Sequence, residues 1–191
     1  MRTFILCLGN ERVSDDGIGA EIGRVLQLLP LPDDILVKVV PRLRLDLLDD
    51  LVGVDHLVIV DALKANAEPG TCTVVDVTEH SAAVVSSGCC HSSEVCDLIQ
   101  LAREVASDDS EFDITIAGVE RGYEDLYGAG FSQSVLAARP RLVDLVLMVT
   151  GAGLKARLLA AEIFRPDHST QRIASRCYEW NAGCEECASL Q

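Results

Sequence analysis

Short apolar runs alternate with helical patterns along the first part of the chain, and this alternation constrains the fold more than any other feature. The runs are TFILCL at 3–8, ILVKVV at 35–40 and LVIV at 57–60. The runs at 3–8 and 57–60 are continuous and apolar, which is typical of strands buried on both faces of a sheet. Strands that alternate with helices pair in parallel through right-handed crossovers. The pattern therefore predicts a parallel sheet between helical layers.

Apolar residues recur at helical spacing between these runs and again in the second half of the chain. The helical stretches begin near Ile18, Leu43, Glu94 and Val135, and a further short helix is predicted over 154–163. Pro140 lies within one of these stretches, so we expect that helix to start or bend there.

Two further strands are predicted at 72–77 and 112–119. The interval between Asp61 and Cys72 is too short for a helical crossover, so the fourth strand is expected to pair antiparallel. The predicted fold class is α/β: a three-layer sandwich with a mostly parallel, five-stranded twisted sheet, one antiparallel strand, and helices on both faces. Residues 1–165 form this domain, and 166–191 form an appended tail that contains cysteines.

Length and composition narrow the class of protein. A chain of 191 residues, 49% hydrophobic, is long enough for one domain with a sizeable core. A net charge of −14 disfavours nucleic acid as a partner, because phosphates would be repelled. No apolar run approaches the ~20 residues of a membrane span, and the run at 4–8 is not followed by a signal-peptide cleavage site. We therefore expect a cytoplasmic protein with no membrane partner, and nothing in the pattern requires more than a monomer.

The chain has eight cysteines, and without an export signal a disulfide framework is not expected. Cys7 and Cys72 lie in strand-like runs and are expected to be small buried residues. The tail holds Cys177, Cys184 and Cys187, which together with His168 offer four ligands for zinc. Three interpretations of the tail stay open: a disordered or partner-binding segment, a zinc-binding clip, or a redox pair.

The loop LGNERVSDDGIGAEI, after the first predicted strand, carries two adjacent carboxylates, Asp15 and Asp16. Glycine-rich loops at this position usually bind phosphate, but two acids repel an anion, and the glycines lack the GxGxxG spacing. Asp15 is expected to cap the N-terminus of the following helix. A second acid exceeds that need, so the loop indicates a cation as ligand.

Two more candidate ligands belong to the same edge of the sheet. Asp61 ends the third predicted strand, and His91 lies at the start of a helix. Each has an ordinary explanation alone, as a turn residue or a surface histidine. Open parallel sheets bind ligands beyond the carboxyl ends of their strands, so the topology brings Asp16, Asp61 and His91 to one edge. Two carboxylates and an imidazole suit a divalent ion such as nickel or zinc.

The same segments resemble the hydrogenase maturation protease family. LGNERVSDDGIGAEI is similar to the family signature, in which G-N and an acid pair precede G-x-G. The resemblance continues in order through LVIVDAL at 57–63, His91, ITIAGVE at 114–120 and GAGFSQSV at 128–135. It covers roughly residues 3–150. The fold that it implies is an α/β sandwich around a twisted sheet, in agreement with the pattern above.

The resemblance implies an endopeptidase, grouped with aspartic-type hydrolases, that removes the C-terminal extension of a nickel–iron hydrogenase large-subunit precursor after nickel insertion. The family's metal-contacting residues fall on Asp16, Asp61 and His91. Asp16 or Asp61 would be the general base for attack of water on the peptide carbonyl. The nickel arrives with the substrate, so no resident cofactor is expected. A nucleophilic Cys90–His91 pair is not favoured, because adjacent side chains seldom face each other.

Two other functions stay open. The same three residues would also suit a peptidase with a resident metal ion and a small-peptide substrate. Alternatively, the protein is a non-catalytic nickel chaperone or redox adaptor that works through its tail cysteines.

Overall fold

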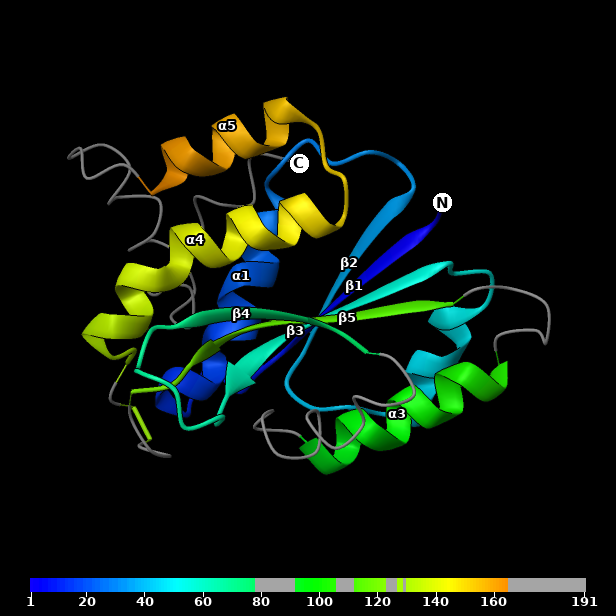
Figure 1. Ribbon diagram of the computed structural model, residues 1–191, viewed down its shortest axis with the longest axis horizontal. Coiled ribbons are helices and arrows are strands. Elements are labelled where there is room, and N and C mark those ends of the chain that lie inside the picture. The colour runs from blue at the N-terminus through cyan, green and yellow to red at the C-terminus, as the bar shows by residue number, and fades with distance from the viewer. Residues whose placement is uncertain (78–91, 106–111, 123–126, 129, 165–191) are drawn as a thin grey trace, which may run out of the picture.

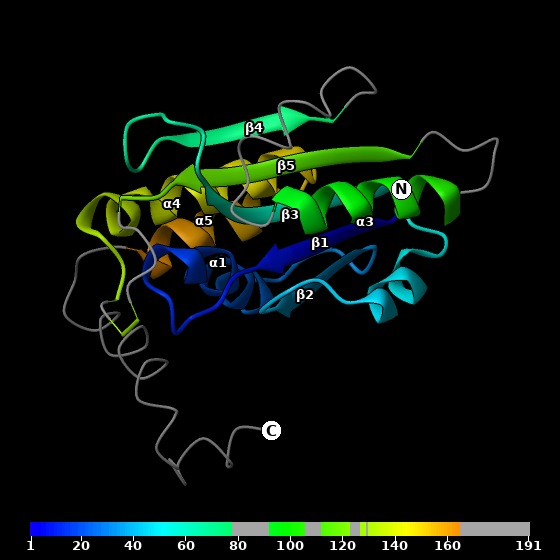
Figure 2. The same ribbon diagram turned by 90° about the horizontal axis from the view of Figure 1, so that it is seen from below.

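A five-stranded sheet forms the centre of the molecule (Figure 1). The computed structural model describes residues 1–77, 92–105, 112–122, 127–128 and 130–164. The strands are β1 (Thr3–Leu8), β2 (Ile35–Val40), β3 (His56–Leu63), β4 (Cys72–Asp76) and β5 (Asp113–Glu120). Figure 2 shows their order, β2-β1-β3-β5-β4. β4 pairs antiparallel with β5 and the other pairs are parallel, so the predicted sheet is confirmed.

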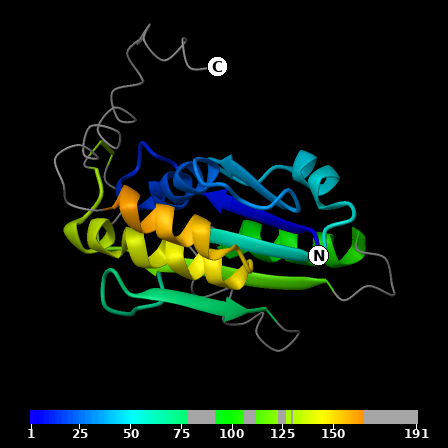
Figure 3. The same ribbon diagram turned by 90° about the horizontal axis from the view of Figure 1, so that it is seen from above.

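Helices cover both faces of this sheet. The helices α1 (Ile18–Gln27), α4 (Gln133–Val149) and α5 (Leu154–Ile163) lie on one side (Figure 3). The helix α3 (Ser92–Val105) and the 3₁₀ helix η2 (Leu45–Leu51) lie on the other side (Figure 1). The three-layer α/β sandwich is therefore confirmed. No helix in the described part of the chain is long and apolar enough to cross a membrane.

The central strand β3 divides the core in two. Val58, Val60 and Ala62 pack with residues of α1 and α4, whereas Ile59 and Leu63 pack with residues of η2 and α3. Successive side chains of a strand point to opposite faces, and both faces are covered here, so every position of β3 is buried. This explains why its sequence reads as an unbroken apolar run.

The end of β3 differs from the prediction. The strand does not stop at Asp61 but continues to Leu63. The reason is the partner strand: β5 extends to Glu120, which pairs with Leu63, while Asp61 pairs with Gly118. Asp61 is therefore held by ladder hydrogen bonds inside a strand and does not form a turn.

The helix α4 begins at Gln133, with Ser132 as its N-cap, and runs through Pro140. Of the two alternatives predicted at Pro140, a start or a bend of the helix, the start is therefore wrong. Proline has no N–H to donate to the carbonyl four residues earlier, which here belongs to Leu136. The Nε of Arg139 donates to that carbonyl oxygen over 3.3 Å. A side chain thus supplies the hydrogen bond that the proline removes, and the helix continues.

A chain of polar side chains, buried at His56 and Thr115 and exposed at Asp76, joins three strands near the amino ends of β3 and β5. The Thr115 hydroxyl donates to Asp76 over 3.0 Å, and the Nε2 of His56 lies 2.9 Å from the same hydroxyl oxygen. Because the only hydroxyl proton is used toward Asp76, Nε2 of His56 must carry the proton in this second bond. Burial lowers the pKa of His56, and the carboxylates of Asp113 and Asp76 oppose that shift. The folded protein therefore favours a neutral His56.

We expect the free energy of unfolding to fall as the pH drops below 6.5, the ordinary pKa of the histidine in the unfolded chain. Below that value the unfolded chain takes up a proton that the folded chain resists, and the loss ends below the lowered folded pKa. His56→Gln keeps a donor toward Thr115 but does not titrate. Urea denaturation between about pH 7.5 and about pH 5.5 should show a steeper loss for the wild type than for this variant. Parallel slopes would contradict the prediction.

Candidate functional site at the carboxyl edge of the sheet

The loop after β1 folds tightly back on itself. Gly9 has a φ of +150°, and a Cβ at this position would lie 2.2 Å from the carbonyl oxygen of Asp16. A Cβ on Gly17 would lie 2.8 Å from the Cα of Glu11. Only glycine permits such close approach of backbone to backbone. The two glycines thus hold the one-turn 3₁₀ helix η1 (Ser14–Gly17), which carries both acids, directly above the end of β1.

The first turn of α1 rests on the carboxyl ends of two strands. A Cβ on Gly19 would lie 1.9 Å from the carbonyl oxygen of Leu8 and 2.5 Å from that of Val60. The helix backbone therefore touches β1 and β3 at once, and η1 contacts β3 as well. As a result, the turn that carries Asp16 lies beside the strand segment that carries Asp61.

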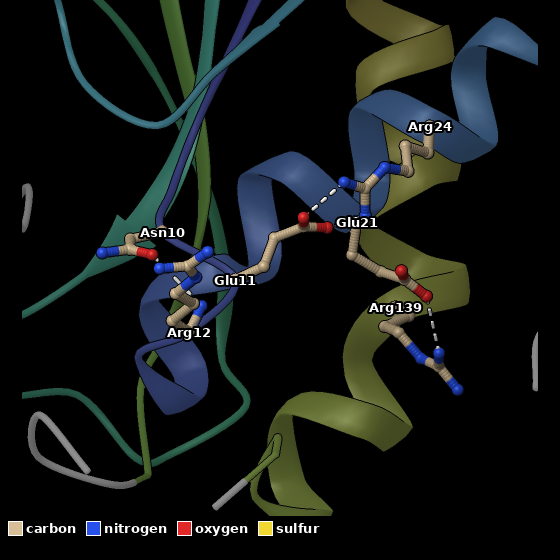
Figure 4. Close-up of polar contacts among 6 residues, drawn as sticks. All are labelled: Asn10, Glu11, Arg12, Glu21, Arg24 and Arg139. Atoms are coloured by element: carbon tan, nitrogen blue, oxygen red, sulfur yellow. Dashed lines mark hydrogen bonds and ion pairs between the residues drawn. The ribbon is translucent and has the colours of Figure 1, made fainter. Parts of the chain in front are cut away.

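Asp16 is half-buried within this loop. Its Oδ2 accepts a hydrogen bond from the backbone N–H of Asn10 over 3.0 Å, and Asn10 in turn accepts one from the N–H of Arg12 over 3.1 Å. Figure 4 shows Asn10 and Arg12 together with an ion pair between Glu11 and Arg24 that fastens the loop to α1. The Asp16 carboxylate is thus oriented by the backbone and retains exposed surface.

Asp61 and Glu120 are the other carboxylates at this edge. Asp61 has 0% of its surface exposed, and its Oδ1 accepts from the N–H of Ala62 over 2.8 Å. Glu120 is 6% exposed, and its Oε2 accepts from the N–H of Ala65 over 2.9 Å. Burial of a carboxylate is tolerated when hydrogen bonds replace its water. Side chains from the β1 loop, β3 and β5 therefore bring three acids to the same end of the sheet.

Asp15 does not cap α1, and that expectation is wrong. The N-cap of α1 is Gly17, with no side-chain cap. The Asp15 carboxylate instead accepts from the backbone N–H of Gly122 and from that of Ser132, each over 2.7 Å. These amides lie 107 and 117 residues further along the chain. The tertiary structure thus offers Asp15 better donors than the nearby helix end.

The predicted ligand His91 lies outside the described residues, as do Cys89, Cys90 and the tail cysteines. Within the described ranges, no group of three histidine, cysteine or acidic side chains is arranged to hold a metal ion. The three-residue set of Asp16, Asp61 and His91 therefore stays a prediction. The two segments that carry its acids, η1 and β3, contact each other in the structure.

The described cysteines of the strands behave as packing residues. Cys7 is fully buried in the core between the sheet and α1, and burial raises the pKa of its thiol. Cys72 is half-buried, and desolvation raises the pKa of its thiol too, opposed by Arg141. A nucleophilic cysteine needs a lowered pKa and access to substrate. Neither Cys7 nor Cys72 meets that need.

A second ion pair fixes α1 against α4. The Nη1 of Arg139 lies 2.9 Å from the Oε1 of Glu21, and the two side chains are only 20% and 16% exposed (Figure 4). The guanidinium also lies 5.6 Å from the centre of the Phe164 ring. Partly buried pairs are screened less by salt than exposed ones. This contact holds the helix that follows the acid loop in a defined position.

Comparisons with known proteins identify the family of the chain. A family model described as hydrogenase maturation protease matches residues 43–149. The chain belongs to this family. The match includes Asp61 and begins after the acid loop, so Asp16 lies outside it. The resemblance noted in the sequence is therefore confirmed at the level of the family.

Individual maturation proteases are similar in sequence or in fold. The curated Hydrogenase 2 maturation protease of Escherichia coli K12 is 32% identical over 106 residues, which cover 54% of this chain and 64% of that protein. The chain thus matches less than two thirds of this curated relative. The hydrogenase maturating endopeptidase HybD from E. coli is 24% identical with a TM-score of 0.66, over 80% of this chain and 95% of that one. The maturation protease HybD from Thermococcus kodakarensis is also 24% identical with a TM-score of 0.66, over 78% of this chain and 99% of that one. These two structures confirm the fold.

We expect Gly19→Ala to destabilise the protein by about 2 kcal/mol or more, because its methyl group would overlap two carbonyl oxygens that cannot move without the sheet. Urea denaturation provides the measurement. Gly153→Ala is the matched control: its φ is −64° and nothing lies within 4 Å of its Cβ, so a loss within about 1 kcal/mol is expected. Equal stabilities of the two variants would contradict the close approach.

Proposed function

We propose that this protein is an endopeptidase that removes the C-terminal extension of a nickel–iron hydrogenase large-subunit precursor once nickel is in place. One observation supports the proposal above all. The chain belongs to the maturation protease family, and its Asp16 and Asp61 lie on contacting segments at the carboxyl edge of the sheet. Ligands of open α/β sheets bind at this edge. Carboxylates there suit a substrate that presents a metal cation.

The two acids differ in accessibility, and this difference suggests an order of events. Asp16 is half-buried, so its carboxylate can meet the nickel of an incoming precursor directly. Asp61 has no exposed surface, so contact with substrate requires that a covering side chain move first. Under this proposal the substrate first engages Asp16 and then gains access to Asp61.

The proposed reaction is attack of a water molecule on the peptide carbonyl, of the aspartic type. One carboxylate takes the proton of the attacking water, and the proton is later delivered to the leaving amine. Asp16 and Asp61 are the candidates for this base, and His91 completes the set proposed to contact the nickel. The metal belongs to the substrate, where it positions the cleavable segment and identifies a precursor that is ready for processing.

The experiment is incubation of the purified protein with nickel-loaded and nickel-free precursor, followed by intact mass measurement over time. We expect a single C-terminal cut in the loaded precursor alone. Asp16→Asn and Asp61→Asn should each reduce the rate by about a hundredfold or more, because an amide cannot accept the proton. His91→Ala should weaken recognition of the loaded form.

Asp33→Asn is the matched control, since Asp33 is an exposed acid just before β2, at the opposite end of the sheet. It should cleave at the wild-type rate. Equal cleavage of the nickel-free precursor would refute recognition of the metal. Full activity of both Asp16→Asn and Asp61→Asn would refute the assignment of the base.

The same purified protein also tests the two alternative functions, a peptidase with a resident metal ion and a non-catalytic nickel chaperone or redox adaptor. One equivalent of a tightly held ion in the purified protein would favour a peptidase with a resident metal. Deletion of residues 166–191 addresses the chaperone or adaptor function: retained processing favours the protease, and loss of all function favours the adaptor.

A further inference from the structure

The Asp15 side chain connects two loops that lie far apart in the sequence. It is fully buried, and its two oxygens accept hydrogen bonds from the N–H groups of Gly122 and Ser132, each over 2.7 Å. Gly122 follows β5, and Ser132 is the N-cap residue of α4. One carboxylate thus joins η1 to the end of a strand and to the start of a helix.

The chemistry of this contact explains the residue type. A carboxylate accepts at both oxygens, and hydrogen bonds to a charged acceptor are stronger than those between neutral groups. An asparagine would turn its NH₂ group toward one of the two amides, so that donor faces donor. An alanine would leave two N–H groups of a buried loop without this acceptor. Among side chains of this size, only aspartate serves both amides.

The connection passes over the carboxyl end of β3. In the sheet β3 lies between β1 and β5, so a loop after β1 can reach the segment after β5 only by crossing above it. Further contacts follow the same path: the N–H of Gly128 donates to the carbonyl oxygen of Arg12 over 3.0 Å, and the hydroxyl of Ser14 donates to that of Gly130 over 3.1 Å. The two loops therefore form a joined rim above the strand that carries Asp61.

Asp15 and Asp16 are consecutive residues of a one-turn 3₁₀ helix. With three residues per turn, their side chains point about 120° apart. Asp15 points to the segment after β5, whereas Asp16 accepts from the N–H of Asn10 in the loop after β1. Rotation of this turn would therefore move both side chains together, so the bonds of Asp15 determine where the Asp16 carboxylate lies.

We infer that Asp15 is a positioning residue: by binding the amides of Gly122 and Ser132 it holds the Asp16 carboxylate in its place at the site. The part of this inference that concerns catalysis rests on the proposed function. The part that concerns geometry is independent of the proposed function, because the exchange rate of the Asn10 amide reports the position of Asp16 without any substrate.

The first experiment is amide hydrogen exchange followed by NMR on Asp15→Asn and on the wild-type protein. We expect the amide that faces the NH₂ group, that of Gly122 or that of Ser132, to exchange about tenfold faster or more, because a donor now faces a donor. The amide of Asn10 should become faster as well, since its acceptor moves. Faster exchange at Gly122 or Ser132 with an unchanged Asn10 would overturn the inference, and so would an unchanged rate at all three.

A second pair of variants tests the same bond from the donor side and does not depend on the folding of Asp15→Asn. Ser132 has a φ of −63°, which proline adopts without strain, so Ser132→Pro removes the N–H that Asp15 accepts. Ser132→Ala is the matched control, because it loses the same hydroxyl cap but keeps the N–H. Faster exchange at Asn10 is expected in the proline variant alone. Equal rates in the two variants would overturn the inference.

The kinetic readout uses nickel-loaded precursor at a temperature where all variants are folded. Ser132→Pro and Asp15→Asn should lower kcat by about tenfold or more, with KM for the precursor within about threefold of wild type, because positioning acts on the chemical step. A wild-type kcat in both variants would overturn the role of Asp15. If the wild type does not cut the precursor, the proposed function fails, and the exchange rates alone decide whether Asp15 positions Asp16.

Discussion

The contact between the first turn of α1 and the ends of β1 and β3 is the constraint on which the rest of the structure depends. At Gly19 the helix backbone meets the carbonyl oxygens of Leu8 and Val60, and at Gly23 a Cβ would lie 2.8 Å from the Cβ of Cys7. Helix and sheet approach this closely only because both positions lack side chains. The short chain between Leu8 and Ile18 must then turn directly above the sheet, which places the acid loop at its carboxyl edge.

Within that loop, neighbouring aspartates have different surroundings and hence different tasks. The carboxylate of Asp15 is enclosed and bound by amides from another part of the chain, so it contributes to structure. Asp16 is half-buried, and its Oδ2 accepts a hydrogen bond from the N–H of Asn10, so its carboxylate keeps surface that a ligand can reach. The sequence shows two identical residues side by side. Their different hydrogen-bond partners follow from the direction in which each side chain points in the 3₁₀ turn.

The strands β1, β3 and β5 were predictable because burial on both faces leaves a strong local pattern. The run at 3–8 is β1 with the same bounds, and the helix over 154–163 is α5. Errors arose where a distant partner decides the outcome. β3 extends past Asp61 because β5 continues beside it, and Asp15 binds amides 107 and 117 residues away instead of capping α1. The site was predictable only in part, since the segments of Asp16 and Asp61 do meet, whereas His91 lies outside the described residues.

The sequence by itself determined the alternation of strands and helices, the family, and the presence of acids after β1 and within β3. Local periodicity and short motifs carry this information, because each depends on residues within a few positions of one another. Only the tertiary structure decided that Asp15 binds Gly122 and Ser132 and that α1 rests on two strands. The hydrogen bonds of Asp15 join residues 107 and 117 positions apart, and the contacts of Gly19 join an early helix to two strands. The geometry of both exists only after sheet order and helix packing have brought these segments together.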